Sequence, residues 1–246
     1  MAKIKEEKQV IDFYKSDAIV YDKDRYSSNI GKKISAKQKN LILKLGQPWK
    51  NKKILEIGCG TGRLTLEVAK EEGLITGLDS SIEMILISKK KVSEDINQNL
   101  QFVNADCSSI PFRNSSFEVC LCINVMNHVP NYEKTIEEIV RVLKPGGILI
   151  VNISNLRGLY FPIGLLVNRR RTSIYKNVYT RWDTLNDFKK IYNRLGLEIE
   201  NIQGGMIYPA LNNRLLFCIV NYLDSLVRNS FLKYYAGNLY IVAKKN

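Results

Sequence analysis

The sequence predicts an α/β fold, a doubly wound, mostly parallel seven-stranded Rossmann-like sheet with helical N-terminal and inserted cap segments. From residue 52 to 153, short apolar runs alternate with amphipathic helical patterns, the order that characterises βαβ units. Residues 117–123, FEVCLCI, are continuously apolar, as expected of a parallel strand that is buried on both faces. A glycine-rich turn directly after the first strand marks a site where a ligand can approach the backbone.

Length and composition indicate one folded α/β domain with embellishments. The 246 residues are 45% hydrophobic and 25% charged, which is ordinary for a globular protein with a full core. No apolar run reaches the ~18–20 residues of a membrane span, and no signal-peptide core precedes the domain, so a cytoplasmic location is expected. Five cysteines and one histidine argue against a zinc site, so no metal is expected. Cys120 and Cys122 are expected to be small buried hydrophobic residues on one sheet face.

The net charge of +13 is concentrated in two flanks. Basic residues exceed acidic ones by 6 in residues 1–50 and by 9 in residues 151–246, whereas acidic residues are in excess by 2 in residues 51–150. Anionic partners near the flanks would fit this asymmetry. A solvated basic surface explains it equally well.

The predicted strands begin with ILEI and end with NLYIVAKK. Five further runs between them are predicted to complete the sheet: 74–79, 100–103, 117–123, 147–153 and 197–202. After the first strand the glycine turn leads into a helix that carries Leu64 and Val68 one turn apart.

The helices are expected from caps and apolar spacing. Ser35 is a candidate cap for a helix that ends at Gly46, and Ser80 with Glu83 forms a capping-box pattern before the helix that starts at residue 82. Helix 131–143 stops at a Lys-Pro-Gly-Gly sequence. Two more helices are expected, at 185–195 behind a Thr184/Asp187 capping box and around 214–228.

Polar residues follow the predicted strands where their carboxyl ends meet at one sheet edge, the place where ligands bind in open α/β sheets. Asp79 follows the second strand and is suited to accept from two ribose hydroxyls. Asp106 follows the third and could accept from an adenine amino group, beside a backbone N–H at Cys107. Asn124 follows the fourth and could hold an amino-acid group. As alternatives, Asp79 caps the next helix and Asp106 caps a turn.

The segments ILEIGCGTG, GLDSS, FVNADCSSIPF, FEVCLCINVMNHV and VRVLKPGGILI resemble, in order and spacing, the class I S-adenosylmethionine-dependent methyltransferases of the ubiquinone/menaquinone-biosynthesis, methyltransferase type 11 branch. The resemblance covers residues 50–153 and continues more loosely beyond them; Glu118 stands where Asp is commoner. It implies S-adenosylmethionine as cofactor and S-adenosylhomocysteine as product. The resemblance further implies that the three glycines lie against the methionine portion of the cofactor and that Glu56 orients its amino group. The full set of cofactor-binding residues expected is Tyr21, Arg25, Glu56, Gly58, Cys59, Gly60, Gly62, Asp79, Ser80, Asp106, Cys107 and Asn124.

Similar enzymes fold an N-terminal segment over the cofactor, which makes residues 1–50 a predicted lid over the domain of residues 51–246. Tyr14, Tyr21 and Arg25 are its candidate contacts, with plain packing as the alternative. Cap insertions are expected at 154–182 and 204–236. His128, the one histidine, is the candidate general base, although its position in the family favours shaping of the pocket.

The acceptor is predicted by exclusion. The chain has no Pro-Cys dipeptide and no Asp/Asn-Pro-Pro-aromatic motif, which argues against pyrimidine C5 and exocyclic-amine methylation of nucleic acid. A small-molecule or lipid-like acceptor is favoured, and the basic flanks would suit one with an anionic group. LYFPIGLLV beside three arginines and RLLFCIVNYLDSLV would suit peripheral membrane contact. The alternatives are an RNA methyltransferase that uses the basic flanks and a non-catalytic cofactor-binding protein. Oligomeric state is left open.

Overall fold

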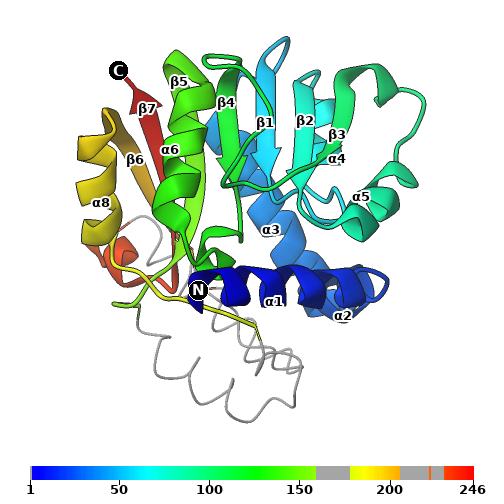
Figure 1. Cartoon of the computed structure of the whole chain (residues 1–246), viewed down its shortest axis with the longest axis horizontal. Coiled ribbons are helices and arrows are strands. Elements are labelled where there is room, and N and C mark those ends of the chain that lie inside the picture. The colour runs from blue at the N-terminus through cyan, green and yellow to red at the C-terminus, as the bar shows by residue number, and fades with distance from the viewer. Residues whose placement is uncertain (1, 159–177, 206–221, 223–229) are drawn as a thin grey trace.

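The computed structural model describes residues 2–158, 178–205, 222 and 230–246, and Figure 1 shows their arrangement. Seven strands form one sheet in the order β3-β2-β1-β4-β5-β7-β6. Their bounds are β1 Lys53–Ile57, β2 Leu74–Asp79, β3 Leu100–Asn104, β4 Phe117–Cys122, β5 Leu143–Ser154, β6 Leu197–Gly205 and β7 Asn238–Lys245. β7 runs antiparallel to both of its neighbours, while the other pairings are parallel. This confirms the predicted doubly wound, mostly parallel sheet.

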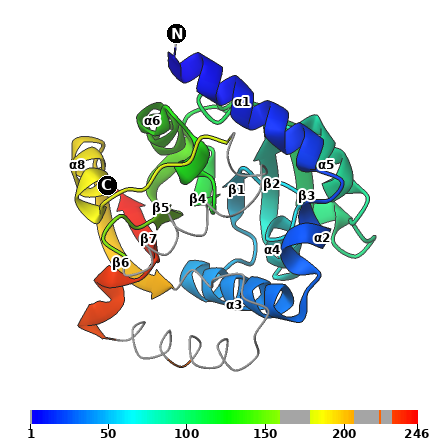
Figure 2. The same ribbon diagram turned by 90° about the horizontal axis from the view of Figure 1, so that it is seen from below.

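Helices cover both faces of this sheet (Figures 1 and 2). They are α1 Ala2–Asp17, α2 Tyr21–Tyr26, α3 Asn29–Gly46, α4 Thr65–Lys70, α5 Ile82–Lys89, α6 Tyr132–Val142 and α8 Leu185–Arg194, with 3-10 turns η1 Asn97–Asn99, η2 Met126–His128 and η3 Phe231–Tyr235. Among the helices of the described residues, none is both long and apolar enough to cross a bilayer. The helix expected around 214–228 and most of both expected cap insertions lie outside the described residues.

Alternation along the strands divides the core into two layers. On one face α6 and α8 pack on the sheet, and this layer contains Cys120 and Cys122, both fully buried. On the other face α3 and α4 pack on the sheet around residues such as Ile42 and Ile54. The two cysteines therefore share a face as buried hydrophobic residues, as expected. The sheet is buried on both sides, and its carboxyl edge is left for the site.

Two predicted helix caps are wrong. α3 begins at Asn29, six residues before Ser35, because the extended Ser28 offers its Oγ to the backbone N–H of Gly31 at 3.0 Å. Ser35 is buried inside that helix. At α5 the cap is Ser81, whose Oγ accepts from the backbone N–H of Met84 at 3.2 Å. The Thr184/Asp187 capping box of α8 is confirmed.

Among the strand ends, the start of β5 departs furthest from the predicted bounds. β5 starts at Leu143, four residues before the predicted strand, because Leu143 already pairs with Phe117; the register then shifts across the Lys-Pro-Gly-Gly segment before Ile148 pairs with Val119. The preceding helix α6 ends at Val142, close to the predicted end. β2 and β7 have the predicted bounds.

The N-terminal helices lie across the carboxyl edge of the sheet. Figure 1 shows α1 beneath the lower ends of β1 and β2, and Figure 2, seen from this side, shows α1 running from near α6 toward α5, with α2 at its far end. α1 contacts α5, and α2 contacts α3. Helices α1 and α2 thus lie where a lid over the predicted site would lie, whereas α3, also within the first 50 residues, packs on a face of the sheet.

Candidate cofactor site

The glycine turn after β1 adopts a conformation that L side chains rarely take. Gly58, Gly60 and Gly62 have φ of +66°, +54° and +76°, in the left-handed region. A Cβ on Gly58 would lie 2.3 Å from Cγ2 of Val125, so the backbone passes directly against the segment after β4. A Cβ on Gly60 would meet no atom within 4 Å. The turn is therefore packed at its first glycine and open at its second.

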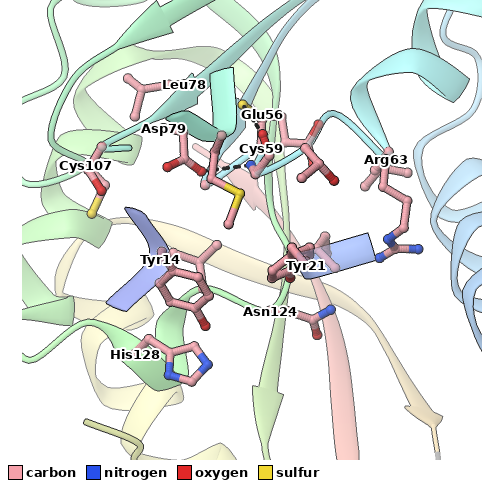
Figure 3. Close-up of a pocket in the computed structure, with 18 of the residues that line it drawn as sticks. Tyr14, Tyr21, Glu56, Cys59, Arg63, Leu78, Asp79, Cys107, Asn124 and His128 are labelled. Atoms are coloured by element: carbon pink, nitrogen blue, oxygen red, sulfur yellow. Dashed lines mark hydrogen bonds between the residues drawn. The ribbon is translucent and has the colours of Figure 1, made fainter. Parts of the chain in front are cut away.

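A cavity opens at this turn, between the carboxyl edge of the sheet and helices α1 and α2 (Figure 3). Most of the predicted binding residues lie on its wall, together with side chains of the N-terminal helices. Figure 3 shows Cys107 and Arg63 at opposite ends, with Asp79 and Glu56 between them. The lining residues are Val10, Tyr14, Tyr21, Tyr26, Glu56, Gly58, Cys59, Gly60, Thr61, Arg63, Leu64, Leu78, Asp79, Ser80, Met84, Ala105, Cys107, Ile123, Asn124, Val125, His128 and Val129.

Asp79 is held rigidly at the end of β2. Its Oδ2 accepts from the backbone N–H of Gly60 at 2.8 Å, and its Oδ1 accepts from that of Ser81 at 2.9 Å. Burial raises the pKa of Asp79 above its usual value, and the two backbone bonds oppose that rise. Asp79 is not the helix cap, so its carboxylate faces the cavity instead. Ser80 follows it on the cavity wall and is exposed.

Glu56 is a buried carboxyl on the same wall, with 4% of its surface exposed. Its Oε2 accepts from the hydroxyl of Thr65. Desolvation raises its pKa to about 7, against the hydrogen bond from Thr65 and the charge of Arg63, which both lower it. An arriving cation would shift this carboxyl toward its ionised form. The role predicted for Glu56, orienting the amino group of the cofactor, needs a carboxyl that ionises when a cation arrives.

Arg63 was missed by the sequence reasoning. Its guanidinium donates to Oε1 of Gln38 at 2.5 Å and to Oγ of Ser35 at 3.1 Å, and it lies 4.8 Å above the ring of Tyr26. It lines the same cavity, and its charge lowers the pKa of Glu56. The sequence feature that could have identified it is an arginine directly after the G-x-G-x-G turn.

Asn124 lies at the end of β4 with φ of +61°, an uncommon value for a residue other than glycine. Its backbone N–H donates to Oδ1 of Asn152 at 2.5 Å, and Nδ2 of Asn152 donates back to its Oδ1 at 2.9 Å. Gln38 also reaches this amide, with Nε2 3.4 Å from Oδ1 of Asn124. Helix α3 therefore connects the end of β4 with Arg63 through Gln38.

The N-terminal helices place aromatic rings over the cavity. Tyr14 and Tyr21 both line it, with ring centroids 6.2 Å apart. Burial raises the pKa of the Tyr21 hydroxyl well above its usual value, so it stays protonated. Arg25 is absent from the described lining; it pairs with Asp17 at 2.6 Å, and its guanidinium lies 4.0 Å above the Tyr21 ring. Arg25 thus backs the wall rather than forming it.

Of the two predicted residues after β3, at the end of the cavity opposite Arg63, only Cys107 lines the wall. Burial raises the pKa of its thiol to about 12, which keeps it protonated. Cys59 of the glycine turn also lines the cavity. Asp106 is exposed and absent from the described lining, and its Oδ1 accepts from the backbone N–H of Ser108 at 2.7 Å. This is the turn-capping alternative. The adenine contact of Asp106 stays a prediction, and Cys107 is the better placed of the two.

His128 has partners at both ring nitrogens. Nδ1 lies 3.0 Å from the carbonyl oxygen of Tyr179, and Nε2 lies 3.0 Å from Nδ2 of Asn127. A carbonyl can only accept, so Nδ1 carries the proton and Nε2 accepts from the Asn127 amide. Burial lowers the pKa of the imidazole, which favours the neutral form. With its lone pair engaged, His128 suits the shaping of the pocket, and Tyr14 packs edge-on against it at 5.7 Å.

Residues 55–151 match the family model described as "Methyltransferase domain". A demethylmenaquinone methyltransferase from Listeria monocytogenes is 34% identical over 127 residues, 50% of this chain and 54% of that protein. A sterol 4-C-methyltransferase from Caenorhabditis elegans is 38% identical over 98 residues, 39% of this chain and 29% of that protein. The chain spans about half the length of the demethylmenaquinone methyltransferase that it matches.

Solved structures agree at the level of the fold. A protein from Thermotoga maritima described as a possible histamine N-methyltransferase superposes with a TM-score of 0.70 at 18% identity, covering 96% of this chain and all of that one. Magnesium protoporphyrin IX methyltransferase from Synechocystis, solved with bound S-adenosylhomocysteine, gives 0.69 at 14% identity, covering 98% and 100%.

The sheet order, the glycine turn and the polar strand ends together define a class I methyltransferase fold. Residues 55–151 thus match a methyltransferase domain, and the whole chain has the fold of S-adenosylmethionine-dependent methyltransferases. The cofactor of this class is S-adenosylmethionine.

Proposed function

We propose that this protein binds S-adenosylmethionine in the cavity at the carboxyl edge and transfers its methyl group to a small-molecule or lipid-like acceptor. The observation that carries the proposal is that Gly60, Glu56 and Asp79 meet on one wall of one cavity. The open Gly60 leaves room for a ligand against the backbone, and the two carboxyls face that space. S-adenosylmethionine supplies an electrophilic methyl carbon on a sulfonium.

The residues present suit the parts of this cofactor. Asp79 would accept from the ribose hydroxyls, because its carboxylate is fixed by two backbone donors. Glu56 would face the amino group, and Arg63, which lines the same cavity, would balance the carboxylate of the cofactor. Leu78 and Cys107 provide an apolar, uncharged surface for the adenine ring.

The chain's contribution to the transfer is to orient the acceptor and exclude water. In-line displacement breaks the methyl–sulfur bond, leaves both electrons on sulfur and forms a bond to the acceptor atom. Proximity and orientation can supply on the order of 7–11 kcal/mol of the barrier. Tyr14, Tyr21 and Val129 close the cavity above the sheet edge and provide the aromatic and apolar surface for this.

The character of that surface supports an acceptor with an apolar ring or chain. Val10, Tyr14 and Val129 contribute no charge, and Arg25 is already paired with Asp17. The named activities of the related methyltransferases, on demethylmenaquinone and a sterol, have acceptors of this kind. The same proposal includes peripheral contact with a membrane and an acceptor that is small or lipid-like.

Calorimetric titration with S-adenosylmethionine tests the cofactor site. Asp79→Ala should weaken binding at least tenfold, whereas Asp95→Ala, an exposed acid that does not line the cavity, should not. Unchanged affinity in Asp79→Ala would refute the assignment of the site. A screen of quinols, sterols, amines and RNA with radiolabelled methyl donor then tests the acceptor; transfer to RNA alone would contradict the small-molecule proposal.

A further inference from the structure

Three polar groups join the lid helix α2 to the glycine turn. Oδ1 of Asp22 accepts from the hydroxyl of Thr61 at 2.7 Å, and Oδ2 of Asp22 pairs with Nζ of Lys91. The same Nζ donates to the carbonyl oxygen of Thr61 at 2.9 Å. The result is a closed triangle of contacts from α2, from the turn between Gly60 and Gly62, and from the segment that follows α5.

Two corners of this triangle belong to the rigid part of the domain. Thr61 is buried in the glycine turn, and α5 holds that turn independently, since Oγ of Ser88 donates to the carbonyl oxygen of Gly60 at 2.7 Å. Lys91 comes just after Lys90, the residue that caps the end of α5. Asp22 is the corner that α2 supplies, so the triangle connects a lid element to a fixed frame.

Helix α2 is six residues long, none of its residues is fully buried, and no side chain caps its start. It packs against α3, and ring contacts from Tyr14 and Arg25 help to place Tyr21 on the cavity wall. The contacts of Asp22, the neighbour of Tyr21, add a polar connection from this helix to the glycine turn.

We infer that Asp22, Thr61 and Lys91 form a latch that holds α2 and Tyr21 closed over the cofactor, and so controls the rate at which the cofactor leaves. The inference rests on the proposed function. The side chains of Lys91 and Asp22 are 35% and 40% exposed, so water and salt can reach the pair and the latch can open. Asp22 and Lys91 are positioning residues, because they act through α2 and the glycine turn.

Cofactor release measured by stopped flow tests the latch. Asp22→Asn removes the charge but keeps the shape, and should raise the dissociation rate constant about fivefold, the scale of one partly exposed ion pair. Asp24→Asn, the same change on the same helix at an exposed acid, is the matched control. Lys91→Met should act like Asp22→Asn, with Lys90→Met as its control. The double variant should be no faster than either single one, because both remove one shared contact.

Reversal of the pair separates a latch from a general loss of structure. Thr61 offers a hydroxyl donor and a carbonyl acceptor, so Asp22→Lys with Lys91→Asp can rebuild the triangle with the roles exchanged. This double variant should restore a dissociation rate within about twofold of the natural protein. Failure of rescue together with additive single effects would overturn the latch.

Amide hydrogen exchange provides a readout that needs no cofactor. Asp22→Asn should raise exchange in residues 21–26 several-fold, and Asp24→Asn should not. If both α2 exchange and cofactor release are unchanged in Asp22→Asn, the latch is refuted even if the protein binds S-adenosylmethionine. If the natural protein binds no S-adenosylmethionine, the proposed function fails, and exchange alone still decides whether Asp22 holds α2.

Discussion

The buried carboxyl of Glu56 makes cofactor binding depend on pH in a defined direction. Its pKa is about 7 because burial disfavours the charged form. At pH 5.5 the carboxyl is mostly protonated, and at pH 7 about half is ionised. The amino group of the cofactor is a cation across this range, since α-amino groups titrate near pH 8. Binding therefore requires Glu56 to release a proton at the lower pH.

The magnitude follows from the ionised fraction. Between pH 5.5 and 7 that fraction rises from about 0.03 to about 0.5, so the affinity for S-adenosylmethionine should rise about fifteenfold. Glu56→Gln is neutral at every pH and should bind weakly with a flat profile. The variant also controls for any other group whose protonation changes over this range.

Calorimetric titration in two buffers with different ionisation enthalpies measures both parts. The natural protein should release close to one proton on binding at pH 5.5 and about half a proton at pH 7, while Glu56→Gln should release none. An equal slope of affinity against pH in both proteins would show that Glu56 does not face the amino group.

Three further predictions concern stability and catalysis. Ionising Glu56 in the folded state is disfavoured, so free-protein stability should fall as pH rises from 4.5 to about 7, by at most about 3 kcal/mol; urea unfolding of Glu56→Gln should lack this fall, and an equal fall would contradict the cause. Gly58→Ala should cost more than about 2 kcal/mol through strain and contact with Val125, and Gly60→Ala only about 1 kcal/mol, also by urea unfolding; equal costs would refute the packing argument. Given an acceptor, His128→Gln should keep kcat within about threefold, whereas a fall of about a hundredfold would identify a general base.

A good part of the fold follows from local sequence. Apolar runs and turn residues predicted β2 and β7 with their observed bounds, because a buried strand can be identified from the pattern of apolar residues within one short segment. The Thr184/Asp187 capping box was likewise visible, since both partners lie within one helical turn. For the site, the turn at Gly58 and the acid at Asp79 were predicted for the same local reason and share one cavity wall.

Tertiary contacts decided what spacing could not. Ser80 and Ser81 are both plausible caps by sequence, and Ser81 holds the position because its own N–H is bound by the Asp79 carboxylate. Asp106 follows a strand as Asp79 does, yet its carboxylate turns back to the local chain and leaves the cavity wall. Local pattern identifies strand ends but not the direction in which each side chain there points.

The sequence by itself determined the class of fold, the position of the glycine turn and the acids that follow the strands, because these depend on neighbours within a few residues. Only the tertiary structure revealed that Arg63 contacts Gln38 on α3 and that Asp22 contacts Lys91 across 69 residues. Such pairs form where separate helices meet, and no periodicity in either segment specifies the other. The glycine turn is thus a local property, and the placement of α1 and α2 beside it is a property of the packed chain.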